Sequence, residues 1–172
     1  MLVMTIDQRG SRRRGDRVDG LLEVLHDRSN SPGIVRGFER TAGDEIQGLL
    51  DDPELAVDIA LRLLRTNDWY IGIGLGTVVG PIPQSVRAAT GTAFVHAREA
   101  VERAKRIPQR IAVVGPDEET AAFAEGLLRL LGTVVRRRTK AGWEVAELME
   151  SGSSQKEVAR KLGITPQAVS QR

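Results

Sequence analysis

Residues 34–50 read IVRGFERTAGDEIQGLL, two apolar, strand-like runs joined by Gly43 and Asp44. We expect a β-hairpin here, because glycine accepts the positive φ of a tight turn and the flanking runs are rich in strand formers. The turn is not the two-residue type that sequence identifies best. Two acids, Asp44 and Glu45, follow the turn glycine. They are either the polar tip of a hairpin or one half of a site that needs a second carboxylate.

The segments around this hairpin have the periodicities of alternating strands and helices. In chain order we expect a strand at 2–6, a helix over about 14–27, a loop at 29–33, the hairpin, a helix from Pro53 to about 64, a strand at 69–80, a loop at 80–90, a helix over 91–105, a strand at 110–115 and a helix ending near 132. This order predicts a ferredoxin-like α+β sandwich whose helices cover one face of the sheet.

Three glycines, Gly72, Gly74 and Gly76, alternate along the strand expected at 69–80 and share one of its faces. Such a face lets another backbone or a ligand approach closely. The spacing does not match the G-x-G-x-x-G pattern of a dinucleotide-binding loop. Pro81 and Pro83 would also block the helix that such a loop opens. We therefore reject a dinucleotide site.

After Gly132 the pattern becomes entirely helical, so we expect one domain over 1–132 and a second, helix-turn-helix domain over 133–172. A first helix is expected over 140–150, packed through Trp143, Ala146, Leu148 and Met149. Ser154 and Glu157 have the spacing of a capping box for a second helix. Gly163 suits the end of that helix, and Thr165 suits the start of a third.

This C-terminal pattern resembles the helix-turn-helix of sigma-factor region 4 and of related bacterial regulators. The resemblance implies that the third helix enters the DNA major groove with its N-terminal residues at base edges. The residues placed at DNA are Thr165, Gln167, Ala168, Ser170, Gln171 and Arg172. Thr165 would lie near a phosphate, and Gln and Ser can hydrogen-bond to bases.

The alternative interpretation is a three-helix module that binds another protein. Residues 139–172 carry five basic and four acidic side chains, and DNA affinity scales with the phosphates that are neutralised. One copy should therefore bind DNA weakly, which favours a homodimer. The arginines at 136–138 could add phosphate contacts, although a run of like charges is more often a solvated face.

Composition restricts the chemistry. The chain has no cysteine and two histidines, so a thiolate nucleophile and cysteine-bound zinc are excluded. Oxygen ligands remain, and these favour magnesium or manganese. No apolar run approaches the roughly 20 residues of a membrane span, and no signal peptide is evident, so we expect a cytoplasmic protein without membrane contact.

A second carboxylate for the hairpin acids is Asp7. In a ferredoxin-like sheet the end of the first strand neighbours the hairpin tip, so Asp7 and Asp44 could share a metal ion. The arginine-rich segment that begins at Arg9 and includes Arg12 and Arg13 could then bind phosphates. The alternative is a polar strand end beside an acidic turn. Glu45 should point away from Asp44 if the strand alternates, which would take it out of the metal's ligand set.

The segments "TIDQRGSR", "GDE" and "YIGIGLGTVVG…TGTAFVHAREA" resemble, in order, the core of class III nucleotidyl cyclases. "AGDEI" is also similar to the diguanylate cyclase signature, from which Ala42 and Ile46 depart. The closest resemblance is to the SatD family of bacterial proteins, which combines a cyclase-like core with a C-terminal helix-turn-helix. Some members of that family are labelled MarR-type regulators.

The resemblance implies that Asp7 and Asp44 hold metal and that Ser11, Arg12 and Arg13 bind the phosphates of a nucleotide. Val95 and Glu99 stand where cyclases carry a catalytic asparagine and arginine. Without those groups the transition state lacks its stabiliser, so we assign no catalytic residue.

These observations lead to one main expectation and two alternatives. The main one is a DNA-binding transcriptional regulator whose degenerate cyclase-like domain binds a ligand or dimerises. The alternatives are a metal-dependent enzyme acting on nucleoside triphosphates, and an adaptor that grips a protein partner.

Overall fold

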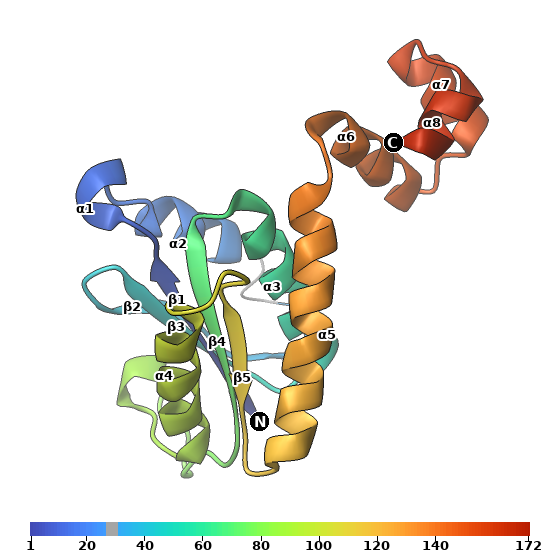
Figure 1. The fold of residues 1–172 in the computed structure, drawn as a ribbon. Coiled ribbons are helices and arrows are strands. Elements are labelled where there is room, and N and C mark those ends of the chain that lie inside the picture. The colour runs from blue at the N-terminus through green and yellow to red at the C-terminus, as the bar shows by residue number, and fades with distance from the viewer. Residues whose placement is uncertain (27–30) are drawn as a thin grey trace. The chain divides into compact units, whose positions relative to one another are not determined.

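The structure is a computed structural model that describes residues 1–26 and 31–172 (Figure 1). The chain divides into two compact units, Met1–Thr133 and Val134–Arg172. The first is a mixed α+β unit built on a five-stranded sheet, and the second is helical. None of the helices in the described part of the chain has the length and apolar character that crossing a membrane requires.

The elements follow in this order: β1 Leu2–Gln8, α1 Ser11–Arg14, α2 Val18–His26, β2 Ile34–Ala42, β3 Glu45–Leu50, α3 Pro53–Thr66, β4 Trp69–Leu75, the 3-10 turn η1 Val86–Ala88, α4 Thr92–Ala104, β5 Ile111–Val114, α5 Glu118–Arg137, α6 Lys140–Glu150, α7 Gln155–Leu162 and α8 Pro166–Gln171. The helix predicted over 14–27 forms as α2 but begins later, at Val18, because Gly15 has a positive φ of 75° and separates α2 from the short helix α1. Its expected end at 27, and the start of the loop predicted at 29–33, lie outside the described residues. The strand predicted at 69–80 ends at Leu75.

The sheet has the order β2-β3-β1-β4-β5. The predicted hairpin forms as β2 and β3, and Gly43 takes the positive φ of 58° that its turn needs. Strand β1 lies between β3 and β4 and is antiparallel to both, while β5 is parallel to β4. The sheet is therefore mixed, as a strand following a crossover helix requires.

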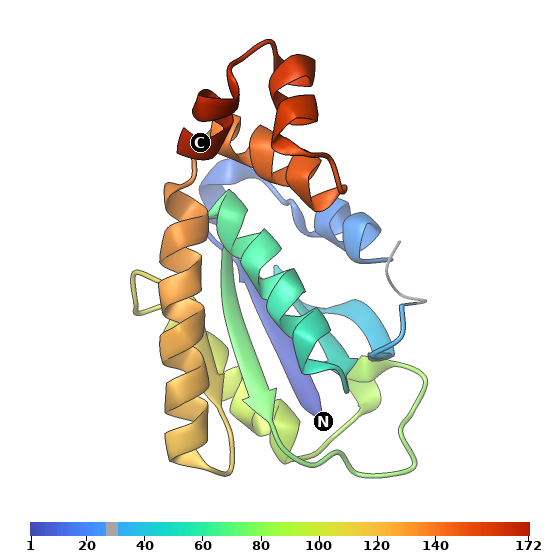
Figure 2. The same ribbon diagram turned by 90° about the vertical axis from the view of Figure 1, so that its right-hand side faces the viewer.

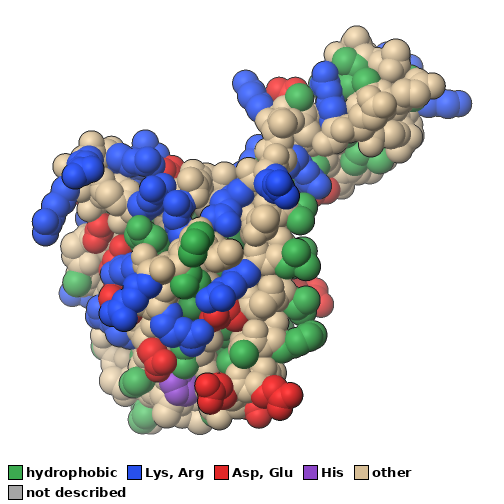
Figure 3. All heavy atoms as spheres, viewed as in Figure 1, with side chains coloured by type: hydrophobic (Ala, Val, Ile, Leu, Met, Phe, Trp, Pro, Cys, Tyr) green, Lys and Arg blue, Asp and Glu red, His purple; other side chains and the backbone are tan. Residues whose placement is uncertain are grey.

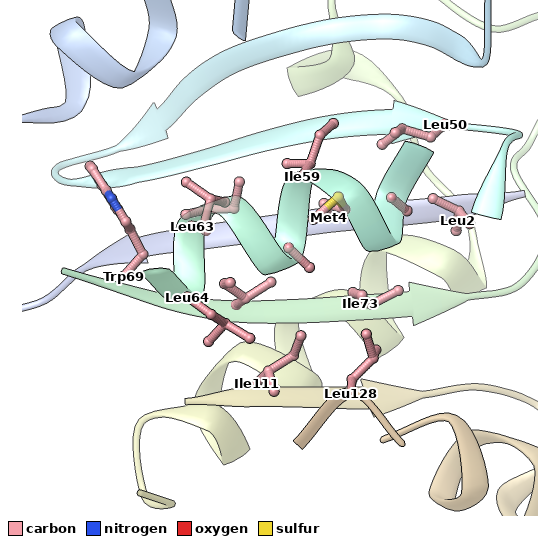
Figure 4. Packing of buried hydrophobic residues seen from close by; sticks show 14 of the residues in the cluster. Leu2, Met4, Leu50, Ile59, Leu63, Leu64, Trp69, Ile73, Ile111 and Leu128 are labelled. Carbon is pink, nitrogen blue, oxygen red and sulfur yellow. The ribbon is translucent and has the colours of Figure 1, made fainter. Parts of the chain in front are cut away.

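Helices cover both faces of the sheet, so the expectation of a single covered face was wrong. On one face Leu2, Met4 and Ile6 of β1 point toward α3 and α5, where they pack in one cluster with Ile59 and Leu128. Figure 2 shows α3 lying across this face, and Figure 4 shows the packing of its side chains. Asp52 begins α3 by accepting hydrogen bonds from the Glu54 and Leu55 amides.

Helix α4 covers the opposite face, and the glycines of β4 explain how. A Cβ atom placed on Gly74 would lie 2.1 Å from the Ala97 nitrogen and 2.2 Å from the Ala93 oxygen. One placed on Gly72 would lie 2.3 Å from the Val101 nitrogen. Sequence left open whether a backbone or a ligand approaches this face, and the structure places the α4 backbone there.

Candidate functional site

The end of β1 lies beside the hairpin tip, as the topology predicted. Asp7 pairs with Glu45 of β3 on one side and with Tyr70 of β4 on the other. The Gln8 amide donates a hydrogen bond of 3.2 Å to the carbonyl oxygen of Asp44. Asp7, Asp44 and Glu45 therefore lie together where β1 ends and β3 begins. We call this group of acids and its surroundings the β1 edge.

Asp7 forms an ion pair with Lys105, which follows the last residue of α4. The Lys105 Nζ lies 2.9 Å from Asp7 Oδ2 and also 2.8 Å from Glu102 Oε1. Burial raises the pKa of the Asp7 carboxyl above its ordinary value, the Lys105 ammonium lowers it, and the charges of Asp44 and Glu45 raise it further. The net result is a raised pKa, which means that this position disfavours the charged form of Asp7.

Glu45 faces the same side of the sheet as Asp7, so the expectation that it leaves the site was wrong. Residues directly opposite in an antiparallel pair share a face, and the register sets Glu45 against Asp7. Its side chain is only 5% exposed. The Arg98 Nη1 of α4 lies 3.2 Å from Glu45 Oε2, and the Thr41 hydroxyl donates to Glu45 Oε1 at 2.7 Å.

These contacts do not fit a resident divalent cation. Lys105 already neutralises Asp7, and Arg98 neutralises Glu45. Among residues 1–26 and 31–172, no group of three or more Asp, Glu or His side chains could hold a metal ion. A magnesium ion can be held by one or two carboxylates together with substrate phosphates. Such an ion, bound through Asp7 and Asp44, would have to displace Lys105 from Asp7.

The arginine-rich segment after β1 is held in place by Gln8. Its side chain donates to the Gly15 carbonyl at 2.6 Å and accepts from the Arg17 amide at 2.8 Å. Two of the arginines then bind Asp68, with Arg14 Nη1 at 2.9 Å and Arg17 Nη1 at 2.7 Å.

Ser11, Arg12 and Arg13 form most of the short helix α1, which buries none of its residues. Arg12 and Arg13 are exposed, and neither pairs with an acidic side chain of the described residues. Their charges are therefore available to an outside anion.

The two α4 positions that depart from the cyclase pattern, Val95 and Glu99, are both exposed. Val95 is 65% exposed. Glu99 lines a hollow of about 430 Å³ together with His96, Arg103 and the residues between β5 and α5, and Asp7 is not among its lining residues.

The second unit consists of three short helices with sharply defined ends. The capping box is present, because Ser154 accepts from the Glu157 amide and the Glu157 carboxylate accepts from the Ser154 amide at 2.8 Å. Gly163 ends α7 with a φ of 65°, and the Thr165 hydroxyl caps α8 by accepting from the Ala168 amide.

The core of this unit is small and aliphatic. Val145, Val158, Ala159 and Val169 are buried together, with Leu148 packed against them. The first helix therefore packs through Val145, which the sequence analysis missed, while Met149 is exposed. A Cβ on Gly142 would lie 2.7 Å from the Arg172 carbonyl oxygen, so this glycine allows α8 to approach α6.

Helix α8 is anchored by Val169 and turns polar side chains outward. Gln167, Ser170 and Gln171 are exposed, as is Arg172, which follows the helix. Ala168 is half-buried, and the Thr165 hydroxyl already serves as the helix cap. Of the six residues placed at DNA from sequence, the two glutamines and Ser170 present the most accessible uncharged hydrogen-bonding groups.

Comparison of the chain with protein-family models, with curated proteins and with solved structures found no match. The likeness to the SatD family and to class III cyclases therefore rests on the quoted motifs alone.

Sequence reasoning missed Lys105, Arg98 and Glu45 as members of the β1 edge. Glu45 could have been found from the pairing of β1 with β3. It lies opposite Asp7, and opposite residues of an antiparallel pair share a face. No sequence signal marks Lys105 or Arg98, because their positions depend on how α4 crosses the sheet.

Proposed function

We propose that this chain is a DNA-binding regulatory protein whose second unit contacts DNA through α8. The observation that carries the proposal is that α8 has one buried side and one exposed side. Val169 is buried in the unit's core, while Gln167, Ser170 and Gln171 are exposed. Amide and hydroxyl groups of this kind read base edges in the major groove, which admits one helix. The cap at Thr165 and the turn at Gly163 hold α8 at a fixed angle to α7.

Positive charge on α7, the helix before α8, supports the same proposal. Lys156, Arg160 and Lys161 of α7 are exposed, and Arg160 and Lys161 line an open depression of about 500 Å³ that also contains one acid, Glu157. Ammonium and guanidinium groups there would neutralise phosphates. Residues 139–172, which contain the three short helices, carry five basic and four acidic side chains, so we expect a single copy to bind weakly and propose that two copies bind two half-sites.

The test is fluorescence anisotropy with labelled genomic fragments at several salt concentrations. The double variant Gln167→Ala with Gln171→Ala should lose sequence preference, since each bidentate glutamine contact contributes about 1–3 kcal/mol of discrimination. Gln84→Ala, an exposed glutamine of the first unit, is the matched control. Binding that is absent at low salt would refute the proposal, as would a double variant that binds like the control. A pull-down that captures a protein when no DNA binds would favour the adaptor instead.

For the first unit we propose a nucleotide-binding role on a ferredoxin-like, cyclase-like framework. The strand order β2-β3-β1-β4 with antiparallel pairing supports this fold, since it is the arrangement of a split βαβ unit. The unpaired charges of Arg12 and Arg13 support phosphate binding near the β1 edge.

Calorimetric titration with nucleotides, with and without Mn²⁺, tests this second proposal. If a metal–nucleotide complex binds at Asp7 and Asp44, Lys105→Gln should tighten binding because the competing ammonium is gone, and Asp44→Ala should weaken it. Equal affinities in both variants and the wild-type chain would refute binding at this edge. Metal-dependent turnover that disappears in Asp44→Ala would favour the enzyme instead.

A further inference from the structure

Helix α5 carries an apolar stripe on the side opposite its buried residues. Ala121, Glu125, Leu128 and Gly132 are the buried residues of this helix. The opposite side presents Phe123, Leu127, Leu130 and Val134, which are 69%, 47%, 63% and 52% exposed. We call these four residues the α5 seam. Figure 3 shows hydrophobic side chains along this helix.

The seam is unusual for a helix on a protein surface. The outward side of an amphipathic helix is normally charged or polar. Here the residues that point outward between Glu119 and Arg137 carry no charge, and Leu131, 43% exposed, widens the stripe. A contiguous apolar surface of this kind marks a contact with another molecule.

The spacing of the seam identifies the kind of contact. Its four residues follow one another at intervals of four, three and four, the spacing of the a and d positions of a coiled coil. Gly126 lies on the exposed side, and a Cβ there would meet no atom within 4 Å, so a second helix can approach closely at that point. The seam is therefore shaped to pair with one other helix.

The charges at the two ends of α5 indicate which helix pairs with the seam and in which direction that helix runs. The first turn contains Glu118 and Glu119, and the last turn contains Arg136 and Arg137. Two copies of the helix side by side and antiparallel place each acidic turn beside the other copy's basic turn. A parallel pair would place like charges together. The helix is thus complementary to itself in the antiparallel arrangement only.

We propose that the α5 seam is the interface of a two-fold homodimer, in which antiparallel α5 helices pair. Phe123 then opposes the partner's Val134, and Leu127 opposes the partner's Leu130. Each contact occurs twice, as a two-fold interface requires. The proposal stands independently of DNA binding and supplies the second copy that a weakly charged helix-turn-helix needs.

Sedimentation equilibrium of the full chain without DNA is the first test. The wild-type chain is expected to be dimeric at micromolar concentration. The double variant Leu127→Glu with Leu130→Glu should raise the dimer dissociation constant at least about 100-fold, because each leucine leaves the interface twice. Val95→Glu, which changes an exposed valine of α4, should leave the dissociation constant unchanged. A monomeric wild-type chain, or a double variant that dimerises like the control, would overturn the proposal.

Disulfide cross-linking tests the orientation without disturbing the seam. Because the chain has no cysteine, single substitutions report one contact at a time. Thr120→Cys and Arg137→Cys are expected to cross-link when the two variants are mixed and to remain uncross-linked when each is oxidised alone. Cross-linking of each variant with itself would show a parallel pair and would overturn the antiparallel arrangement. DNA plays no part in either test, so failure here is separate from failure of DNA binding.

Discussion

Gly74→Ala should destabilise the first unit far more than an ordinary glycine-to-alanine change, because α4 lies directly against this glycine. The new Cβ would lie 2.1 Å and 2.2 Å from two backbone atoms of α4. Backbone atoms cannot rotate away as a side chain does. To restore a separation of about 3.5 Å, α4 has to move off the sheet by more than about 1 Å.

That movement opens the layer formed by Val3, Leu49, Ala93 and Ala97, which are fully buried. Overpacking of this kind typically lowers the free energy of unfolding by about 1–3 kcal/mol. Because the clash is with helix backbone, we expect Gly74→Ala to lower it by about 3 kcal/mol. For a chain of this size, this corresponds to a fall in melting temperature of about 6–12 °C. Urea unfolding followed by far-ultraviolet circular dichroism measures the change.

Gly20→Ala is the matched control, because Gly20 lies within α2 and a Cβ there meets nothing within 4 Å. It should stabilise the chain by about 0.5–1 kcal/mol, the ordinary gain from alanine in a helix. If Gly74→Ala lies within about 0.5 kcal/mol of the wild type while the control behaves as expected, α4 does not rest on the glycine face. That face would then be open to a ligand.

Two further predictions concern single side chains. The folded state raises the pKa of Asp7 above its ordinary value of 3.8. The stabilising contribution of this group is therefore fully present below pH 3.8 and is lost as the pH rises through the raised pKa. Asp7→Asn lacks this loss, so its stability relative to the wild type should increase between about pH 3 and pH 7; a pH-independent difference in urea unfolding would contradict the assigned burial. Ser154→Ala should cost the second unit about 1 kcal/mol through loss of the α7 cap, whereas Ser153→Ala should cost little. Thermal unfolding of the two variants compares them, and equal losses would argue against the capping box.

The fold was predictable where local chemistry decides it. Gly43 permits one kind of turn, Pro53 begins a helix, and Ser154 with Glu157 caps another, so each element could be placed from a few residues. The order of the elements then predicted the α+β class and the proximity of Asp7 to the hairpin tip.

The covered second face was not predicted, because its determinant is a contact between distant segments. Gly72 and Gly74 signalled a close approach but not the identity of the partner, and only the fold places α4 there. The same crossing brings Lys105 to Asp7 and Arg98 to Glu45. Ion pairs of this kind depend on the path of a helix over the sheet, and residue spacing does not encode it.

The central claim is that α8 reads DNA, and the most direct measurement is anisotropy of wild-type chain on genomic fragments across a salt series. The logarithm of the affinity should fall linearly with the logarithm of salt concentration, as expected when basic side chains displace counterions. Gln167→Ala with Gln171→Ala should keep this salt dependence and lose the preference among fragments. Absence of binding at low salt, or an unchanged preference in the double variant, would contradict the claim.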